Sequence, residues 1–146
     1  MSKADKLLKL TENFEVMKMV DAAPLVKGMF RPNGVMQFWI SDPESMRSPH
    51  EVTVIKDGDK VVGWSGIGYT RIGRQMLPLV SVFVDPAYRN KGYGQALVKA
   101  VLQREQPDID EPVFYDPMAP QLGKWIDDEN YDSEPIPADQ LAPDDK

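Results

Sequence analysis

The sequence contains no cysteine and only one histidine, His50. Without cysteine there is no disulfide, thiolate nucleophile or cysteine-ligated metal, and a lone histidine makes a histidine-built metal site an unfavourable hypothesis. No apolar run approaches the roughly 20 residues that a membrane-spanning helix needs. The basic start MSKADKLLKL has too short an apolar part for a secretory signal. We therefore expect a cytoplasmic protein with no metal site and no membrane insertion.

The length and composition are those of one globular domain. The chain has 146 residues, of which 42% are apolar and 27% charged, and a domain of that size buries about 70% of the surface that its unfolded chain exposes. Charge is distributed unevenly: residues 1–104 hold 15 Lys/Arg and 10 Asp/Glu, whereas residues 105–146 hold 2 and 13. Such asymmetry indicates either a solvated acidic tail or a surface that attracts cations.

The two ends of the chain differ from its middle. Residues 132–146, DSEPIPADQLAPDDK, combine three prolines with five acidic residues and few apolar ones, a composition typical of flexible or loosely docked segments. We therefore expect a folded domain over residues 1–131 and an acidic, proline-rich tail over 132–146. A short helix at residues 2–10, with Ser2 as N-cap, is a further expectation.

The first third of the domain gives mixed signals. Residues 15–20 fit a strand or a helical piece equally well. Asp21 has the character of an N-cap, and the apolar spacing that follows predicts a helix over residues 22–30, with Pro24 tolerated in its first turn. The stretch Arg31-Pro32-Asn33-Gly34 would end it.

The middle of the chain predicts a β-meander followed by alternating elements. Asp57-Gly58 is a hairpin signal, and the continuous apolar character of residues 79–84 is typical of a strand buried on both faces. The predicted strands are residues 52–56, 60–69, 77–84 and 113–115, and the predicted helices are residues 93–104 and 119–128. This order belongs to the α/β (α+β) class.

The loop that follows the meander has the composition of an anion-binding site. Arg89-Asn90-Lys91-Gly92-Tyr93-Gly94 separates the buried strand from the next helix. The first turn of a helix has N–H groups without intrahelical partners and a partial positive charge, so it binds phosphate-like anions. Glycine allows close backbone approach. The bare pattern also fits a turn without a ligand, and it is neither the dinucleotide-binding fingerprint nor a P-loop.

The stretch VFVDPAYRNKGYGQALV resembles the acetyl-CoA-binding motif of the GNAT superfamily of N-acetyltransferases. That motif is a strand, then V-x-P-x-Y-R-x-x-G-x-G/A, then a helix. Eight residues match it in order within fourteen positions: Val84, Pro86, Tyr88, Arg89, Gly92, Gly94, Ala96 and Leu97. The resemblance extends over about residues 14–131. It implies one GNAT-like domain with a central mixed, mostly antiparallel sheet flanked by helices.

The resemblance also implies a cofactor site for acetyl-CoA, used as co-substrate. Backbone groups at the end of the strand would pair with the pantetheine arm, and loop amides would hold the pyrophosphate. The residues that it assigns to the strand are Val82, Phe83 and Val84, and those of the loop are Arg89, Asn90, Lys91, Gly92, Tyr93 and Gly94, with Gln95 close by.

The catalytic groups of the family are harder to place. Many members carry a glutamate on the strand before the loop, where this chain has Ser81, which would have to act through a water. The family's thiolate-protonating tyrosine falls at Ile126, so Tyr115 or Tyr131 would have to replace it. His50, beside Glu51, is a candidate base at the acceptor site. For each of these candidates a packing or surface role is the favoured alternative.

The function expected from the resemblance is transfer of an acetyl group from acetyl-CoA to a primary amine by direct attack. The acidic C-terminal third favours a cationic acceptor, such as a lysine side chain, a protein N-terminus or a small amine, and opposes nucleic acid through phosphate repulsion. A homodimer is left open. The alternatives are a catalytically degenerate module that binds acyl-CoA or a protein, and a small regulatory protein acting through its acidic tail.

Overall fold

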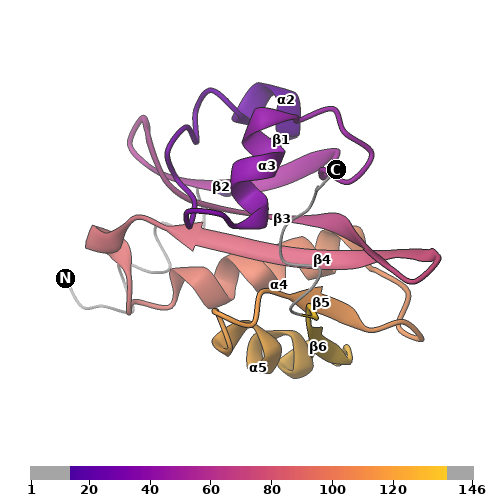
Figure 1. Cartoon of the computed structure of the whole chain (residues 1–146). Helices are drawn as coiled ribbons and strands as arrows, with labels where there is room; N and C mark the ends of the chain where they lie inside the picture. Colours follow the sequence, from indigo (N-terminus) through magenta and orange to yellow (C-terminus); the bar gives the residue numbers. More distant parts are fainter. Residues whose placement is uncertain (1–13, 138–146) are drawn as a thin grey trace.

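The computed structural model describes residues 14–137, so the helix expected at residues 2–10 lies outside it. Six strands form one sheet in the order β1-β2-β3-β4-β5-β6 (Figure 1). They span Phe14–Lys18 (β1), Glu51–Asp57 (β2), Lys60–Ile72 (β3), Gln75–Val84 (β4), Val113–Tyr115 (β5) and Ser133–Pro135 (β6).

The sheet is mixed, as predicted. The first four strands pair antiparallel in sequence order, whereas β5 pairs parallel with β4 and β6 pairs parallel with β5. The central strands are the longest, with 13 residues in β3 and 10 in β4. Gly73, with φ of 62°, makes the turn between them, a conformation that glycine adopts without steric cost. The meander is therefore confirmed.

Helices lie on both faces of this sheet. The helices α2 and α3 cover one face, and α4 packs on the other with α5 beside it (Figure 1). A single turn of 3₁₀-helix, η1, follows β4. These elements span Met19–Ala22 (α2), Val35–Ser41 (α3), Pro86–Tyr88 (η1), Tyr93–Glu105 (α4) and Gln121–Asp128 (α5).

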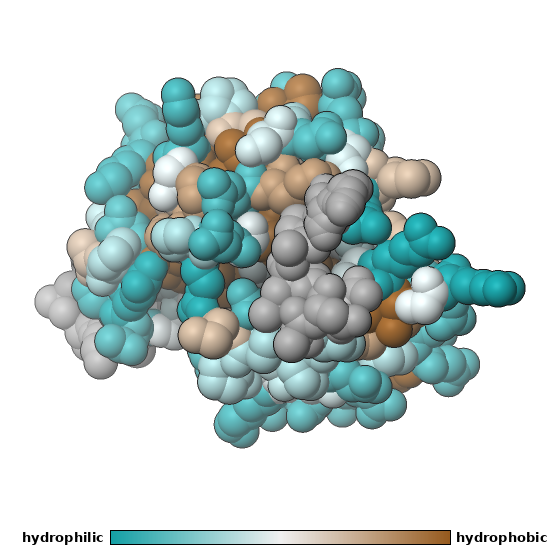
Figure 2. Space-filling view, viewed as in Figure 1, coloured by the Kyte–Doolittle hydropathy of each residue, from teal (hydrophilic) through white to brown (hydrophobic). Residues whose placement is uncertain are grey.

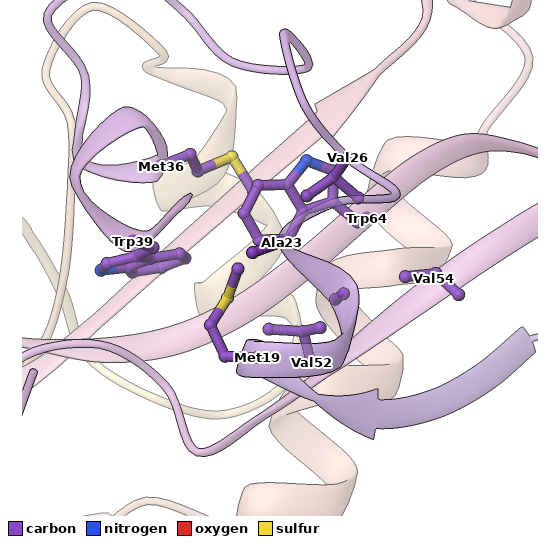
Figure 3. Close-up of a cluster of buried hydrophobic side chains, with 9 residues drawn as sticks. Met19, Ala23, Val26, Met36, Trp39, Val52, Val54 and Trp64 are labelled. Carbon is purple, nitrogen blue, oxygen red and sulfur yellow. The ribbon is translucent and has the colours of Figure 1, made fainter. Parts of the chain in front are cut away.

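The core under α2 and α3 is built around two tryptophans. Trp39 from α3 and Trp64 from β3 are fully buried, and their rings meet edge to face with centroids 6.1 Å apart (Figure 3). The indole of Trp64 donates to Met29 O at 2.9 Å. Gly68 is needed beside them, because a Cβ there would lie 2.8 Å from the Trp39 ring and 2.5 Å from Arg47 O. This packing fixes α3 against β3.

The opposite face is closed by α4. Its buried side chains lie three to four residues apart and pack on β3 and β4 (Leu97, Val98, Val101 and Leu102). Ser65, fully buried on β3, donates its hydroxyl to Leu97 O at 2.9 Å. The predicted helix over residues 93–104 is thus confirmed, and its N-terminus is held at the end of β4.

The helix expected over residues 22–30 is wrong. The α-helix is only Met19–Ala22, with Asp21 inside it rather than at its N-cap. Pro24 has no N–H to continue the backbone ladder, and Gly28, with φ of 81°, turns the chain. The apolar spacing that suggested a helix still places Val26 in the core.

The tail predicted to begin at residue 132 also needs correction. Residues 133–135 form β6, which is locked to β5 by hydrogen bonds from Val113 N to Asp132 O and from Ile136 N to Tyr115 O, both 2.8 Å. Ile136 is buried as well. A strand therefore occupies the start of that segment, and residues 138–146 lie outside the described range.

The surface is mostly hydrophilic in the view of Figure 2, with hydrophobic residues showing mainly in the upper half, where Figure 1 draws α2 and α3. Within residues 14–137 no helix has both the length and the apolar character that crossing a bilayer requires.

Candidate functional site

The sheet opens between β4 and β5. The two strands pair at one position only, Leu79 with Phe114, although β4 continues to Val84. Beyond Leu79, β4 is bonded on its β3 side alone. The sheet therefore contains an internal gap at the carboxyl end of β4, directly before the loop with the anion-site composition.

The backbone groups that face this gap follow from the register. Asp85 donates its N–H to Val62 O at 2.8 Å, so the backbone N–H of Asp85 points toward β3. Direction alternates along an antiparallel strand, and the peptide groups of Val82 and Val84 therefore face the gap. Arg89 confirms this, because its Nε donates to Val84 O at 2.7 Å. Val82 keeps both its N–H and its C=O without a strand partner.

The loop after β4 contains a run of amides without acceptors among the described residues. Asn90 and Gly92 both have left-handed backbone, with φ of 63° and 90°, and Gly92 is the N-cap of α4. The first hydrogen bond of the helix runs from Ala96 N to Gly92 O at 3.1 Å. Within residues 14–137, the N–H groups of residues 90–95 donate to no acceptor. Such a run of free amides at a helix start is an anion-binding arrangement.

Side chains beneath the loop hold it in place. The hydroxyl of Tyr88 donates to Asp57 Oδ2 at 2.6 Å, and Asp85 Oδ1 accepts the N–H of Ala87 at 3.0 Å. The hydrogen bond to Asp57 is the main cause that raises the pKa of Tyr88 above its ordinary value, with burial and the charges of Asp57 and Asp85 adding to it. The loop is thereby tied to the β2–β3 hairpin.

Tyr93 anchors the first turn of α4 from inside. Its side chain is 1% exposed and packs near Ile55 and Leu97, and its hydroxyl has no partner among the described residues. Burial raises the pKa of this phenol, and the charge of Asp57 adds to the shift. The neutral, buried ring of Tyr93 therefore anchors the first turn of α4, where the free amides lie.

A pocket of about 800 Å³ connects the gap, the loop and the far face of the sheet. One end is formed by the loop and α5, and the other by the segment before α3 and by α3 itself. Its walls are lined by Phe30, Arg31, Pro32, Gly34, Val35, Met36, Ser81, Val82, Phe83, Val84, Tyr88, Arg89, Asn90, Gly92, Tyr93, Gly94, Gln95, Asp116, Ala119, Gln121, Leu122 and Trp125.

The predicted cofactor residues line this pocket, with one exception. Lys91 is absent from the walls: its ammonium lies over the Tyr88 ring, 5.9 Å from the centroid, and donates to Ala87 O at 3.5 Å. Arg89 is inside, with its guanidinium 5.1 Å from the centroid of Phe83. Of the two loop cations, Arg89 alone therefore lines the pocket.

Gly94 has a packing role as well. A Cβ at this position would lie 3.2 Å from the Trp125 ring and 3.8 Å from Val84 Cγ2. The absence of a side chain thus lets the indole of α5 approach the first turn of α4 and form one wall of the pocket.

Of the four catalytic candidates, the structure places Ser81 alone in the pocket. Side chains alternate along β4, and Phe83 packs with the tryptophan cluster under α3, so Ser81 lies on that same face. Its hydroxyl makes no hydrogen bond within the described range. It is therefore available to a water or a substrate.

Tyr115, Tyr131 and His50 lie elsewhere. The hydroxyl of Tyr115 fills the space left by Gly123, where a Cβ would be 2.8 Å away. Tyr131 packs against the cluster between α4 and α5. His50 is exposed, and its backbone carbonyl accepts the N–H of Met19 at 2.9 Å. None of the three lines the pocket.

Sequence reasoning missed Asp116 as a site residue. It follows β5 immediately and lines the pocket. Its position in the sequence, between a short strand and the last helix, was the available signal, because side chains after a strand that borders an opening can reach into it.

Comparison with protein families matches residues 19–106 to the acetyltransferase (GNAT) family. The match covers more than half of the chain and includes the meander, the loop and α4. The chain therefore belongs to the GNAT acetyltransferase family. Comparison with curated proteins gave no significant sequence match.

The chain is also similar to solved structures of acetyltransferases. Glucosamine-6-phosphate N-acetyltransferase from Arabidopsis thaliana is 16% identical with a TM-score of 0.50, over 85% of this chain and 95% of that one. A GNAT acetyltransferase from Brucella melitensis, crystallised with acetyl-CoA, is 17% identical with a TM-score of 0.46, over 64% and 68%. A GCN5-related N-acetyltransferase from Kribbella flavida is 20% identical with a TM-score of 0.36, over 64% of this chain, which spans 27% of that protein.

Proposed function

We propose that the protein transfers an acetyl group from acetyl-CoA to a primary amine. The observation that carries this proposal is the joining, in one pocket, of unpaired loop amides at the start of α4 with an unpaired strand edge on β4. The first arrangement suits a pyrophosphate and the second suits an extended chain that contains amide groups.

The residues present fit the CoA part of acetyl-CoA. The free N–H groups of residues 90–95 would hold the pyrophosphate, since a helix start favours negative charge. Val82 offers one N–H and one C=O to the amides of the pantetheine arm. Trp125 and Gly94 would enclose the arm between α4 and α5. When bound, acetyl-CoA supplies the activated acetyl thioester.

The chain itself contributes orientation and hydrogen bonding. A backbone N–H that is already fixed in a sheet needs no reorganisation to stabilise negative charge that develops on a carbonyl oxygen, and the N–H of Val82 has that position in the gap. The walls of the pocket bring an amine from the α3 side toward the same point, which provides proximity. Ser81 is placed on that side to hold a water.

The acceptor enters from the end formed by Phe30, Val35 and Met36, according to this proposal. It is a primary amine on a small cationic molecule, a lysine side chain or a protein N-terminus. The acidic C-terminal third favours a cation in general, although of its described residues only Asp116 reaches the pocket walls.

The first test is calorimetric titration with CoA and with pantetheine, which lacks the pyrophosphate. We expect CoA to bind at least tenfold more tightly than pantetheine. Equal affinities would refute the pyrophosphate cradle. The second test measures thiol release from acetyl-CoA with a panel of polyamines, aminosugars, amino acids and lysine-containing peptides.

A second function is a CoA-binding module without catalysis. The observation in its favour is that no glutamate or histidine lines the pocket in the described part of the chain. Tight CoA binding without thiol release on any amine of the panel would support it, whereas turnover with one amine would reject it.

A further inference from the structure

The pocket contains a single carboxylate. Asp116 is half-buried and lines its wall, and no other lining residue within 14–137 carries a carboxylate or an imidazole. The positive side chains on the walls are Arg31 and Arg89. Any ammonium group that enters this pocket therefore meets one negative partner.

The register places Asp116 at the gap. Leu79 pairs with Phe114 in parallel. Ser81 lies two residues further along β4, and Asp116 directly follows Tyr115, the last residue of β5. Ser81 and Asp116 therefore follow the last paired position of the two strands, one on each side of the gap. Both line the pocket. The carboxylate is thus positioned where the two strands part.

Short-range bonds hold Asp116 in that position. Its Oδ1 accepts the N–H of Met118 at 2.8 Å, and its carbonyl accepts the N–H of Ala119 at 2.9 Å. Arg31 reaches across from the segment before α3 and donates from Nη2 to Met118 O at 3.1 Å. These bonds fix the turn between β5 and α5, both from within the turn and from the segment before α3.

The second carboxylate oxygen remains available. Among residues 14–137, Oδ2 of Asp116 accepts no hydrogen bond, and no cation lies within 4.0 Å to form a salt bridge with Asp116. Arg31, which also lines the pocket, donates to a backbone carbonyl instead. Oδ2 can therefore accept a hydrogen bond from a ligand in the pocket.

We propose that Asp116 binds the ammonium group of the acceptor and takes up its proton. This inference rests on the proposed function. The nitrogen must be neutral before it can attack a carbonyl carbon. The proton moves from the ammonium nitrogen to Oδ2 of Asp116 and from there to solvent, which leaves the nitrogen lone pair free. Attraction between charges is stronger at such a site than in bulk water, so the pocket selects amines over alcohols.

The test uses the full-length protein, its D116N variant and a matched control, D110N. Asp110 is exposed, belongs to the same acidic third of the chain and does not line the pocket. The amide side chain introduced by D116N keeps an oxygen for the N–H of Met118, so the turn is preserved. The probe is n-butylammonium chloride, titrated into CoA-saturated protein and followed by NMR through the side-chain carboxyl carbon of Asp116 and the backbone amides.

We expect similar CoA affinity in all three proteins. The probe should shift the Asp116 carboxyl resonance in the wild type, bind D110N equally well, and bind D116N at least tenfold more weakly. An unmoved Asp116 resonance, or undiminished binding by D116N, would overturn the role of Asp116. Failure of the wild type to bind CoA would refute the proposed function instead, and the same titration without CoA would then still decide the role of Asp116.

Discussion

Replacing Gly92 by alanine tests the anion cradle most directly. Gly92 has φ of 90°, lines the pocket and caps α4. A side chain in left-handed backbone costs about 1–2 kcal/mol. For a domain of this size that cost lowers Tm by about 3–8 °C. In addition, the new methyl group would stand among the amides that hold the pyrophosphate, so CoA affinity should fall at least tenfold, about 1.4 kcal/mol.

The control is Gly73→Ala. Gly73 has φ of 62° in the β3–β4 turn, and a Cβ there would meet no atom within 4 Å. The Gly73→Ala substitution therefore introduces similar backbone strain away from the pocket. Calorimetric titration with CoA and thermal unfolding are measured on both variants. Equal Tm losses with a CoA defect in Gly92→Ala alone are expected. Unchanged CoA affinity in Gly92→Ala, or the same loss in both variants, would refute the reasoning.

Three further predictions concern stability. Ser65→Ala removes the buried hydrogen bond to Leu97 O and should lower the free energy of unfolding in urea by about 1 kcal/mol; no change would show that the bond contributes nothing. Tyr93→Phe deletes a buried hydroxyl without a described partner and should raise the free energy of unfolding by up to about 1 kcal/mol; a loss would reveal a partner. Because the pKa values of Tyr88 and Tyr93 are raised in the folded state above the ordinary 10.0, the folded state keeps its phenolic protons longer. Stability should therefore be fully present below pH 10 and decline as pH rises through the raised values, less steeply in Tyr93→Phe; urea midpoints across this range, identical for both proteins, would contradict this.

The sequence predicted best where local patterns and long-range structure coincide. Local sequence patterns predict the Asp57-Gly58 turn and the apolar strand over residues 77–84, and both are found in the sheet. The segment from Pro24 to Phe30 shows the reverse case. Its apolar residues keep helical spacing, but backbone constraints at Pro24 and Gly28 decide its conformation.

Parallel pairing explains the other misses. Residues 133–135 read Ser-Glu-Pro, which carries no strand pattern, and they become β6 only because β5 offers an edge to them. Asp116 enters the pocket for a related reason, since β5 parts from β4 just there. The pairing of β6 and the opening beside Asp116 both depend on how the strands assemble, so local sequence patterns alone do not establish them.

An open strand edge is normally a hazard, because a second molecule can add its own strand there and begin to aggregate. In this protein the unsatisfied part of β4 lies in the interior of the sheet, between β3 and the parting β5, where it is bordered by α4 and α5. A neighbouring protein that adds a strand at the border of the sheet does not meet these groups, because β4 is not a border strand. The chain can thus display peptide hydrogen-bonding capacity permanently without endangering its own solubility.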